Sequence, residues 1–404
     1  MAEVNQRLRA ARQAMSSPAS PAFVLSRSEL AELAGAAIYR HTGRVAALDG
    51  HYVAKLERGA IRWPGSDYRR ALREVLGAAA DSELGFRPPR RGAATAPPRT
   101  STVLAGNETE RERLADVLAG RCRVDKTIVT HLAEVATAQR HIEETIGSSR
   151  VLPATLAEIE LVEHLIRQAC GEVWSSLVAL LAEHHQLAGW MSEDSGDSHA
   201  ALRHIDRGMQ AAQEIDGANL VASMFGLRSH LAWGSGDAVG VVDMAQAGQR
   251  DSHRLSPAVL GCLAQMQARG HALHSQGAVA DQLIDTTEGL TDQAHTHPED
   301  EPWWMYFQTP ERVLFQRGVA YVDLGRHQEA GDLLEKAQAT LPASYRRDHG
   351  RWAARLALSR ANDGDPAGAL TAGLQALSIA LDTGSAYTIA DLRRMRRILD
   401  RQQP

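Results

Sequence analysis

The sequence predicts an all-α protein in which a small basic helical domain precedes a longer solenoid of helix pairs. Hydrophobic residues make up 44% of the 404 residues but aromatics only 5%, and the predominance of Ala and Leu favours helix over sheet. Glycine-containing turns recur at nearly regular intervals in the second half. Residues 1–91 hold 15 Arg and Lys against 9 Asp and Glu, whereas the remainder holds 29 against 40. Such a division suggests that only the basic part meets a polyanion.

Cysteine usage and hydropathy indicate the compartment. Cys122, Cys170 and Cys262 are far apart and form no CxxC pair, which is typical of a reducing cytoplasm and argues against a disulfide framework or a zinc finger. No apolar run approaches the ~18 residues that cross a bilayer, and the segment MAEVNQRLRAARQ is polar rather than a signal peptide. We therefore expect a cytoplasmic protein that contacts no membrane.

The first two helices are predicted over Asn5–Met15 and Ser26–Gly35. The first has an apolar stripe formed by Val4, Leu8 and Ala11. The second opens on Ser26 and Glu29, which form a capping box because each side chain can satisfy the other's backbone amide. A long connection, SSPASPAFVL, separates the two helices.

The third helix lies within LDGHYVAKLERGAIRWP, residues 48–64. Asp49 is its expected N-cap, and Gly59 is expected to end it in the left-handed conformation. At ~100° per residue, Val53 and Leu56 fall on one side of this helix. The opposite side is cationic and can donate hydrogen bonds, since it carries His51, Lys55 and Arg58.

A fourth helix follows in SDYRRALREVLG, with Ser66 as the expected cap and Gly77 at its end. Its inward residues are predicted to be Tyr68, Leu72, Val75 and Leu76. Four short helices with an exposed basic helix third in order match a helix-turn-helix domain. We assign this domain to residues 1–86.

The segments LRAAR, SRSELAELAG, HYVAKLERG and RWP…YRRALREVLG resemble the Cro/CI-type (XRE) DNA-binding domain, with its lambda-repressor-like fold, over residues 4–77. The resemblance implies that the third helix is a recognition helix in the major groove of operator DNA. His51 and Lys55 would face base edges, with Tyr52 beside them, and arginines would hold phosphates. The implied DNA-binding residues are Arg27, Ser28, Gly50, His51, Tyr52, Lys55, Arg58 and Arg62. It also implies a structural salt bridge between Arg9 and Glu57.

The sequence departs from the XRE pattern between the second and third helices. The segment AAIYRHTGRVAAL separates Gly35 from Asp49, where the family has a tight turn. We expect the second helix to continue to Arg40 and to stop at Gly43. The basic residues of this extension would then project toward the DNA backbone; they are Arg40, His41 and Arg44.

A flexible linker is predicted over residues 87–110, because FRPPRRGAATAPPRTST has four prolines, four arginines and no apolar pattern. Residues 111–404 form the predicted body. It begins with long amphipathic helices over Val124–Gly147 and Leu156–Trp190. Turns then recur at spacings of 40, 41, 48 and 39 residues, at Gly196, Gly236, Gly277, Gly325 and Gly364. Regular turns between helix pairs predict an α-solenoid.

The fourth repeat matches the tetratricopeptide (TPR) signature most clearly. Small residues that allow close helix crossing alternate with larger residues that fill the groove, at Leu314, Gly318, Tyr321, Ala330, Leu334, Ala337 and Pro342. The repeats resemble the degenerate TPR modules that follow XRE domains in actinobacterial regulators. The segments LAGWMSEDSGD and TIGSSRVLP are similar to that architecture too.

Ligand binding is predicted on the concave face of the solenoid. The densest aromatic stretch supplies the candidate residues Trp303, Trp304, Tyr306 and Phe307, since aromatics with a polar tip anchor ligands well. The alternative is that they pack the first helix of the fourth repeat. The other tryptophans of the body are expected in the core; they are Trp174, Trp190, Trp233 and Trp352.

No catalytic motif and no metal-ligand set with defined spacing occurs, so we expect neither an enzyme nor a cofactor. The histidines of AEHHQ and HTHPED have no such set of partners. The sequence therefore predicts a transcriptional regulator that binds an operator as a homodimer. Its TPR-like body would bind a peptide, a small molecule or a protein that modulates DNA binding. The alternative is a TPR protein-interaction scaffold without specific DNA recognition.

Overall fold

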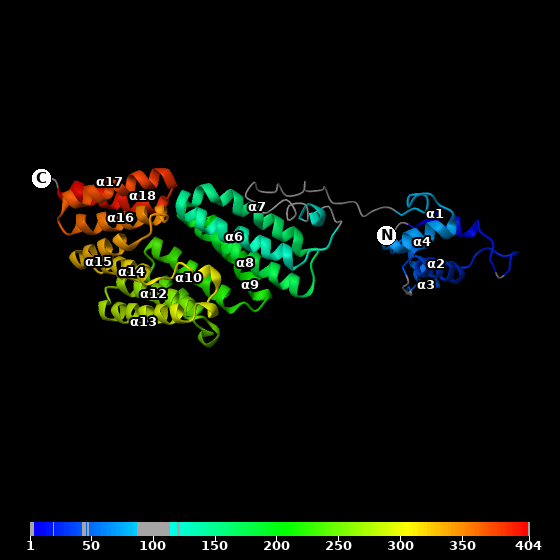
Figure 1. Ribbon diagram of the computed structural model, residues 1–404, viewed down its shortest axis with the longest axis horizontal. Helices are drawn as coiled ribbons and strands as arrows, with labels where there is room; N and C mark the ends of the chain where they lie inside the picture. Colours follow the sequence, from blue (N-terminus) through cyan, green and yellow to red (C-terminus); the bar gives the residue numbers. More distant parts are fainter. Residues whose placement is uncertain are drawn as a thin grey trace. The chain divides into compact units, whose positions relative to one another are not determined.

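Helices make up the regular structure of the part of the chain described by this computed structural model (Figure 1), residues 4–18, 20–42, 46, 48–86, 114–118 and 122–402. These residues form no strand, and one isolated bridge joins Ser16 and Val24. The predicted all-α class is confirmed. The chain divides into a first unit, residues 1–97, and a second unit, residues 98–404. The predicted linker, residues 87–110, lies outside the described residues.

Four helices surround one core in the first unit. They are α1 (Gln6–Gln13), α2 (Arg27–Thr42), α3 (Gly50–Glu57) and α4 (Ser66–Leu76). Leucines from all four are fully buried together, at Leu8, Leu30, Leu56 and Leu72. After α4 the chain returns to this core with buried Leu84 and Phe86, and the Asn5 side-chain amide donates to the Leu84 carbonyl at 2.9 Å. Phe86, the first residue of the Pro- and Arg-rich segment, therefore belongs to the folded unit.

Most of the predicted helix ends of the first unit are confirmed. The Asp49 carboxylate accepts from the Tyr52 amide at 2.7 Å, and Gly59 has φ 71°. The capping box forms, with Ser26 N to Glu29 Oε2 at 2.8 Å and Glu29 N to Ser26 Oγ at 3.2 Å. Two predictions are wrong. Ser66 is the first residue of α4 and its side chain caps nothing, and Val4 is exposed because α1 begins only after its N-cap, Asn5.

Helix α2 continues to Thr42, beyond Gly35. Arg40 and His41, predicted to project toward DNA, contact Glu74 of α4 at 2.9 and 2.7 Å instead. Both cations share the Glu74 carboxylate and so join α2 to α4, while the Arg40 side chain stays largely exposed. Arg44 lies outside the described residues.

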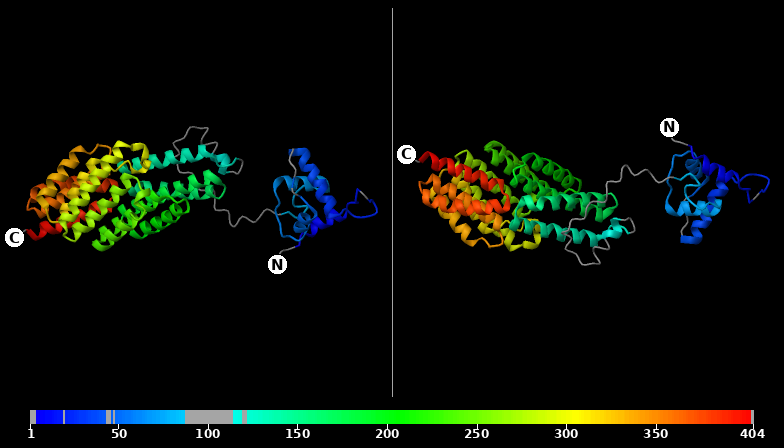
Figure 2. Two further views of the ribbon diagram at one scale, coloured as in Figure 1. Left: turned by 90° about the horizontal axis from the view of Figure 1, so that it is seen from below. Right: turned by 90° about the horizontal axis from the view of Figure 1, so that it is seen from above.

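The second unit is a succession of helices that lie side by side (Figures 1 and 2). They are α6 (Lys126–Ile146), α7 (Ser148–Ile166), α8 (Gly171–Asp194), α9 (Ser198–Glu214), α10 (Ala218–Ser235), α11 (Ala238–Gly248), α12 (Pro257–Leu273), α13 (Gly277–Thr296), α14 (Pro310–Asp323), α15 (His327–Thr340), α16 (Arg346–Asn362), α17 (Pro366–Thr383) and α18 (Ala386–Gln402). Short 3-10 turns occur at η1 (Ser252–Arg254), η2 (Pro298–Asp300) and η3 (Trp303–Met305).

The single helix predicted over Leu156–Trp190 is wrong, because α7 ends at Ile166 and α8 begins at Gly171. Cys170 is extended and Gly171 has φ 59°. Only glycine adopts that backbone conformation without a steric penalty. The break is therefore set by one residue inside an otherwise apolar periodic segment.

Successive helices pack as antiparallel pairs: α8 with α9, α10 with α11, α12 with α13, α14 with α15, and α16 with α17. Four of the predicted turn glycines have positive φ: Gly196, Gly236, Gly325 and Gly364. The third turn differs, since Ser275 takes the left-handed conformation (φ 59°) and Gly277 begins α13.

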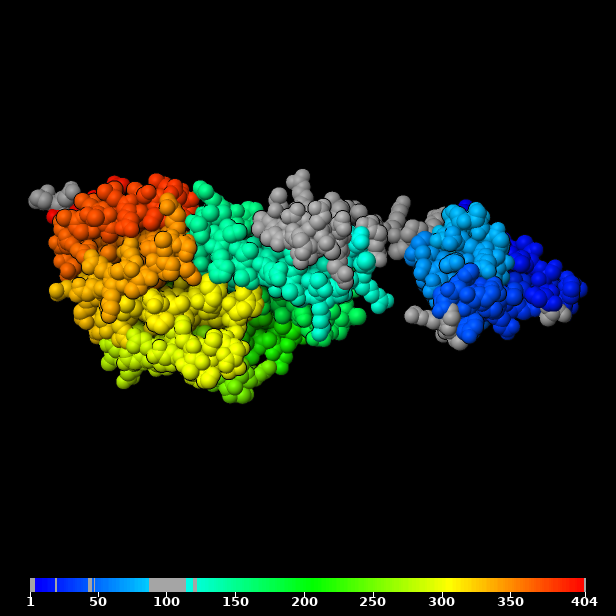
Figure 3. All heavy atoms as spheres, viewed as in Figure 1, coloured from blue at the N-terminus to red at the C-terminus, as the bar shows by residue number. Residues whose placement is uncertain are grey.

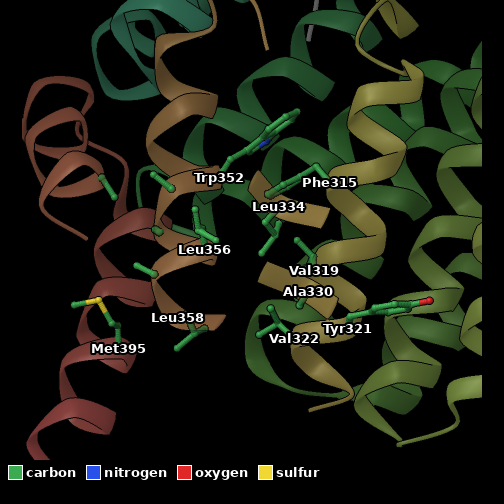
Figure 4. Packing of buried hydrophobic residues seen from close by; sticks show 14 of the residues in the cluster. Phe315, Val319, Tyr321, Val322, Ala330, Leu334, Trp352, Leu356, Leu358 and Met395 are labelled. Carbon is green, nitrogen blue, oxygen red and sulfur yellow. The ribbon is translucent and has the colours of Figure 1, made fainter. Parts of the chain in front are cut away.

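The pair α14 and α15 packs closely at its small residues. Ala330, Leu334 and Ala337 have no exposed area. A Cβ added to Gly318 would lie 2.8 Å from Leu334 Cγ, so glycine sets how near the two helices approach. Beside them, Phe315 stacks on Trp352 of α16 with ring centroids 4.4 Å apart (Figure 4).

The first helices of the second unit meet its last helices. α6 packs against α16 and α17, and α7 packs against α17. On the face shown in Figure 3, the segment of α6 and α7 (cyan) adjoins that of α16 and α17 (orange to red). A Cβ on Gly147 would lie 2.1 Å from the Thr383 carbonyl oxygen, which shows how closely the two ends approach. The row of helices therefore closes on itself.

None of the described helices combines the length and the hydropathy that a bilayer crossing requires.

The close approach of α14 and α15 gives a test of the packing. We expect Gly318→Ala to destabilise the second unit by about 1–3 kcal/mol, because the buried Leu334 has no room to move away from the new methyl group. The measurement is chemical unfolding followed by circular dichroism. Gly289→Ala in α13 is the matched control. Its Cβ would meet nothing within 4 Å, so we expect a gain of about 0.5–1 kcal/mol. Equal effects of the two substitutions would contradict this account of the packing.

Candidate functional site

Helix α3 has one buried face and one exposed cationic face. Val53 and Leu56 have no exposed area, whereas His51, Lys55 and Arg58 are exposed. These side chains therefore remain available to a partner while the helix is held by its apolar residues.

The N-terminal ends of α2 and α3 lie side by side. A Cβ on Gly50 would be 2.7 Å from Ser28 Oγ and 3.2 Å from Ser28 N, so glycine permits this approach. Helix N-termini present unpaired amides and partial positive charge, an arrangement that favours phosphate. Arg27, Ser28 and His51 are exposed at these two ends.

The remaining predicted DNA-binding residues are placed as follows. Tyr52 is half-buried and stacks on Tyr68 of α4, with ring centroids 5.3 Å apart. Gly50 is also half-buried, and Arg62 is exposed beyond the end of α3. Tyr52 thus helps to hold α3 on α4.

A buried carboxylate joins α1, α2 and α3. Glu57 is only 2% exposed, and its two oxygens accept from Arg12 Nε at 2.7 Å and Arg27 Nε at 2.8 Å. The predicted partner Arg9 is wrong. Arg12 follows Leu8 by one helical turn and so shares its buried side, whereas Arg9 is on the exposed side of α1. Burial acts to raise the pKa of Glu57, but the hydrogen bonds from Arg12 and Arg27 hold it below its usual range.

The second unit contains a partly open cavity of about 130 Å³. Its walls come from the first helices of the successive pairs, together with α6 and residues 305–307. Five guanidinium groups line it: Arg140, Arg269, Arg312, Arg347 and Arg351. Two carboxylates face them, Glu143 and Glu144. The cavity is thus rich in hydrogen-bond donors that suit an anion.

The structure separates the four candidate ligand-binding aromatics. Tyr306 and Phe307 line the cavity, and the Tyr306 hydroxyl donates to Glu144 Oε1 at 2.7 Å. Trp304 is buried in a hydrophobic cluster. Trp303 is 38% exposed and lies 5.4 Å from the Arg140 guanidinium. All four precede α14 rather than forming part of it.

Trp190, expected in the core, is a half-buried wall of the cavity. Arg347 and Arg351 lie over its ring at 5.2 and 5.0 Å. Trp233 and Trp352 are buried as expected, and Trp174 is half-buried.

The sequence interpretation missed the arginines of the cavity. A signal for them exists in α16, where arginines recur every four residues along a helix that is otherwise rich in Ala and Leu, at Arg347, Arg351 and Arg355. Charged residues at that spacing share one helix face, and all three are buried. A buried cationic stripe is unusual and indicates an enclosed polar site.

The histidines of AEHHQ and HTHPED, for which the sequence predicts no metal site, differ in burial. Burial lowers the pKa of His184 to about 4 and, with the neighbouring His204, that of His185 to about 3, so both are neutral packing groups. On the surface, His297, Glu299 and Asp300 bring possible ligand atoms within 4.8 Å of one another, and we assign no ion to them.

The Glu57 cluster predicts a pH-dependent stability of the first unit. The carboxyl group has a pKa near 4.5 when unfolded and a lower one when folded. Its stabilising effect is therefore complete above pH 4.5 and is lost as the pH falls through the folded value. We expect Glu57→Gln to cost about 3 kcal/mol at pH 7, because buried Arg12 loses its counter-charge, and to flatten this acid dependence.

The measurement is hydrogen exchange of α3 peptides after equilibration in urea at pH 7 and pH 4. The control is Arg9→Gln, which we expect to leave exchange unchanged because Arg9 makes no side-chain contact with Glu57. Slower exchange in Glu57→Gln than in the parent chain would contradict the structural role of this cluster.

The chain matches no protein-family model and no curated protein.

Proposed function

We propose that the protein is a cytoplasmic, non-enzymatic transcriptional regulator of XRE type that binds operator DNA in a sequence-specific manner. In this proposal the first unit is a lambda-repressor-like helix-turn-helix domain and the second is a TPR-like ligand sensor. One observation supports it most strongly. Helix α3 is fixed by Val53, Leu56 and the Glu57 cluster, and its opposite side presents His51 and Lys55 to solvent.

The chemistry of α3 suits a DNA major groove, which admits one α-helix. Lys55 can donate to guanine O6 and N7, and a His51 ring nitrogen can bond to a purine. Arg58 and Arg62 follow on exposed positions from which they can neutralise phosphates. The adjoining N-termini of α2 and α3 supply further donors to the backbone. Base contacts and phosphate contacts therefore fall to different parts of one surface.

The buried contacts around α3 hold this helix in one orientation. A base-edge contact requires donors held to within a fraction of an ångström, which depends on the support beneath them. Glu57 ties α3 to α1 and α2, and the Tyr52–Tyr68 stack ties it to α4. We propose that these contacts fix the recognition helix before it meets DNA.

The proposal includes a homodimer and a ligand. Two copies related by a two-fold axis would read the two half-sites of a palindromic operator. A peptide, small molecule or protein bound by the second unit would shift the population of the DNA-competent form, provided that it binds the two forms with different affinity.

DNA recognition is tested on fragments recovered from sheared genomic DNA by the full-length protein and then sequenced. We expect His51→Ala combined with Lys55→Ala to weaken binding to the recovered fragment at least about tenfold, because base contacts are lost. Fluorescence anisotropy with the labelled fragment measures the affinity.

The matched control removes one histidine and one basic side chain elsewhere in the first unit. His41 and Arg70 contact each other at 3.2 Å, near the far end of α2 from Ser28, and His41→Ala with Arg70→Ala should leave the affinity within about threefold. Intact specific binding by the His51/Lys55 variant would show that α3 is not the recognition helix. Binding to no fragment, with no steep salt dependence, would favour the protein-interaction scaffold instead.

A further inference from the structure

Three arginines of the cavity wall are buried without a carboxylate partner. Arg140, Arg269 and Arg351 are 6%, 2% and 7% exposed, and none forms an ion pair with another described residue. Arg140 donates to the Gln186 side chain and the Glu183 carbonyl. Arg269 contacts the Gln316 side chain and the Met266 sulfur. Arg351 bonds the His230 ring at 3.0 Å.

Neutral partners leave these groups incompletely satisfied. The Nε atoms of Arg140 and Arg269 are buried and have no hydrogen-bond partner. Burial, together with the nearby Arg351 and Arg355, lowers the pKa of Arg269 to about 9. Carboxylates act on them only from beyond ion-pair distance: Glu183 on Arg140, Asp323 on Arg269 and Asp194 on Arg351. A buried charge without a directly bonded counter-charge is unfavourable, so a protein retains one where another function requires it.

The other arginines nearby, two buried and one half-buried, form ion pairs. Arg347 pairs with Glu143 and Asp348, Arg355 pairs with Asp391 at 2.8 Å, and Arg312 lies 3.3 Å from Asp348. The contrast separates arginines that hold the helices together from arginines whose positive charge remains available to the cavity.

The carboxylates that line the cavity leave that charge in excess. Glu143 is engaged by Arg347. Glu144 accepts from the Tyr306 hydroxyl, and burial raises the pKa of Glu144 to about 7, so at neutral pH it carries only part of a charge. His230, between Arg351 and the Trp233 ring, stays neutral because burial and the surrounding arginines hold its pKa well below the usual range.

Apolar side chains form another part of the wall. Trp190, Leu227, Val259, Leu263 and Phe307 face the same space. A volume of about 130 Å³ is less than that of typical drug-sized pockets, so it suits a small molecule or one end of a larger one. Guanidinium donors beside aromatic and aliphatic surface match an anionic head joined to an apolar body.

We propose that the cavity binds a small organic anion, with its carboxylate or phosphate group between Arg269 and Arg351 and its apolar part against Trp190 and Phe307. The ligand class named here rests on the sensor role proposed above. The bound anion would supply the negative charge that no neighbouring side chain brings into ion-pair contact with these arginines. Each guanidinium group can donate two parallel hydrogen bonds to the oxyanion.

The test is isothermal titration calorimetry of the full-length protein without DNA, using phenyl phosphate, phenylacetate and the neutral phenylacetamide at equal ionic strength. We expect at least one anion to bind at least tenfold more tightly than the amide. Comparison of the two anions then shows whether the site prefers a phosphate or a carboxylate group. Arg269→Gln combined with Arg351→Gln should weaken that anion at least tenfold. No binding by either anion, binding equal to that of the amide, or an unchanged affinity of the variant would overturn the proposal.

A second measurement separates a ligand-binding arginine from a structural one. Arg355 is the matched control, since it lies one turn beyond Arg351 in α16, is equally buried and also stacks on an aromatic ring. We expect Arg351→Met to leave the thermal midpoint unchanged or raise it, because a buried charge that forms no ion pair is removed. Arg355→Met should lower it by at least about 5 °C, because Asp391 is left unpaired.

Phenyl phosphate or phenylacetate should raise the midpoint of the parent chain but not that of Arg351→Met. A midpoint that falls as far in Arg351→Met as in Arg355→Met would assign Arg351 to the packing and end the proposal. These experiments contain no DNA, so their failure and a failure of DNA recognition are separate results.

Discussion

The ion pair between Arg347 and Glu143 connects α16 to α6 across 204 positions of sequence, and the closed form of the second unit depends on it. Arg347 Nη1 reaches both oxygens of Glu143, at 2.5 and 2.7 Å, and Nη2 reaches Asp348 at 2.8 Å. Ser148 then donates to Glu143 at 2.6 Å and lies 2.8 Å from Asp194. Burying so many charges is tolerable only because each finds a partner. Loss of one partner would leave the others uncompensated.

This network and the cavity share residues, since Arg347 and Glu143 are also cavity walls. An anion bound by Arg269 and Arg351 would change the field at the contacts that join the ends of the second unit. Arg351 contributes to holding the pKa of Asp348 low, after Arg347 and Arg312. The proposed sensor thus has a physical basis for coupling, because ligand binding and closure draw on the same charges.

The first unit contains a smaller buried ion-pair network of the same kind. Glu57 is buried between Arg12 and Arg27, as Glu143 and Asp348 are buried around Arg347. In each case leucines and alanines supply most of the buried surface, which is non-directional. A buried ion pair adds direction, because only one arrangement of helices satisfies it. We infer that these pairs specify helix arrangement more than they add stability.

The sequence by itself determined the features that depend on neighbours within about four residues. Asp49, Gly59, Gly77 and the Ser26–Glu29 box mark helix ends in the structure as they do in the sequence. The recurring turn glycines and the small residues of α14 and α15 likewise predicted the antiparallel pairs. Only the tertiary structure decided that Arg12 meets Glu57, that α6 returns to α16, and that five arginines from four helices face one cavity. The first depends on how α1 packs against α3. The other two depend on small rotations between successive helix pairs that accumulate along the chain, and no local sequence pattern specifies either.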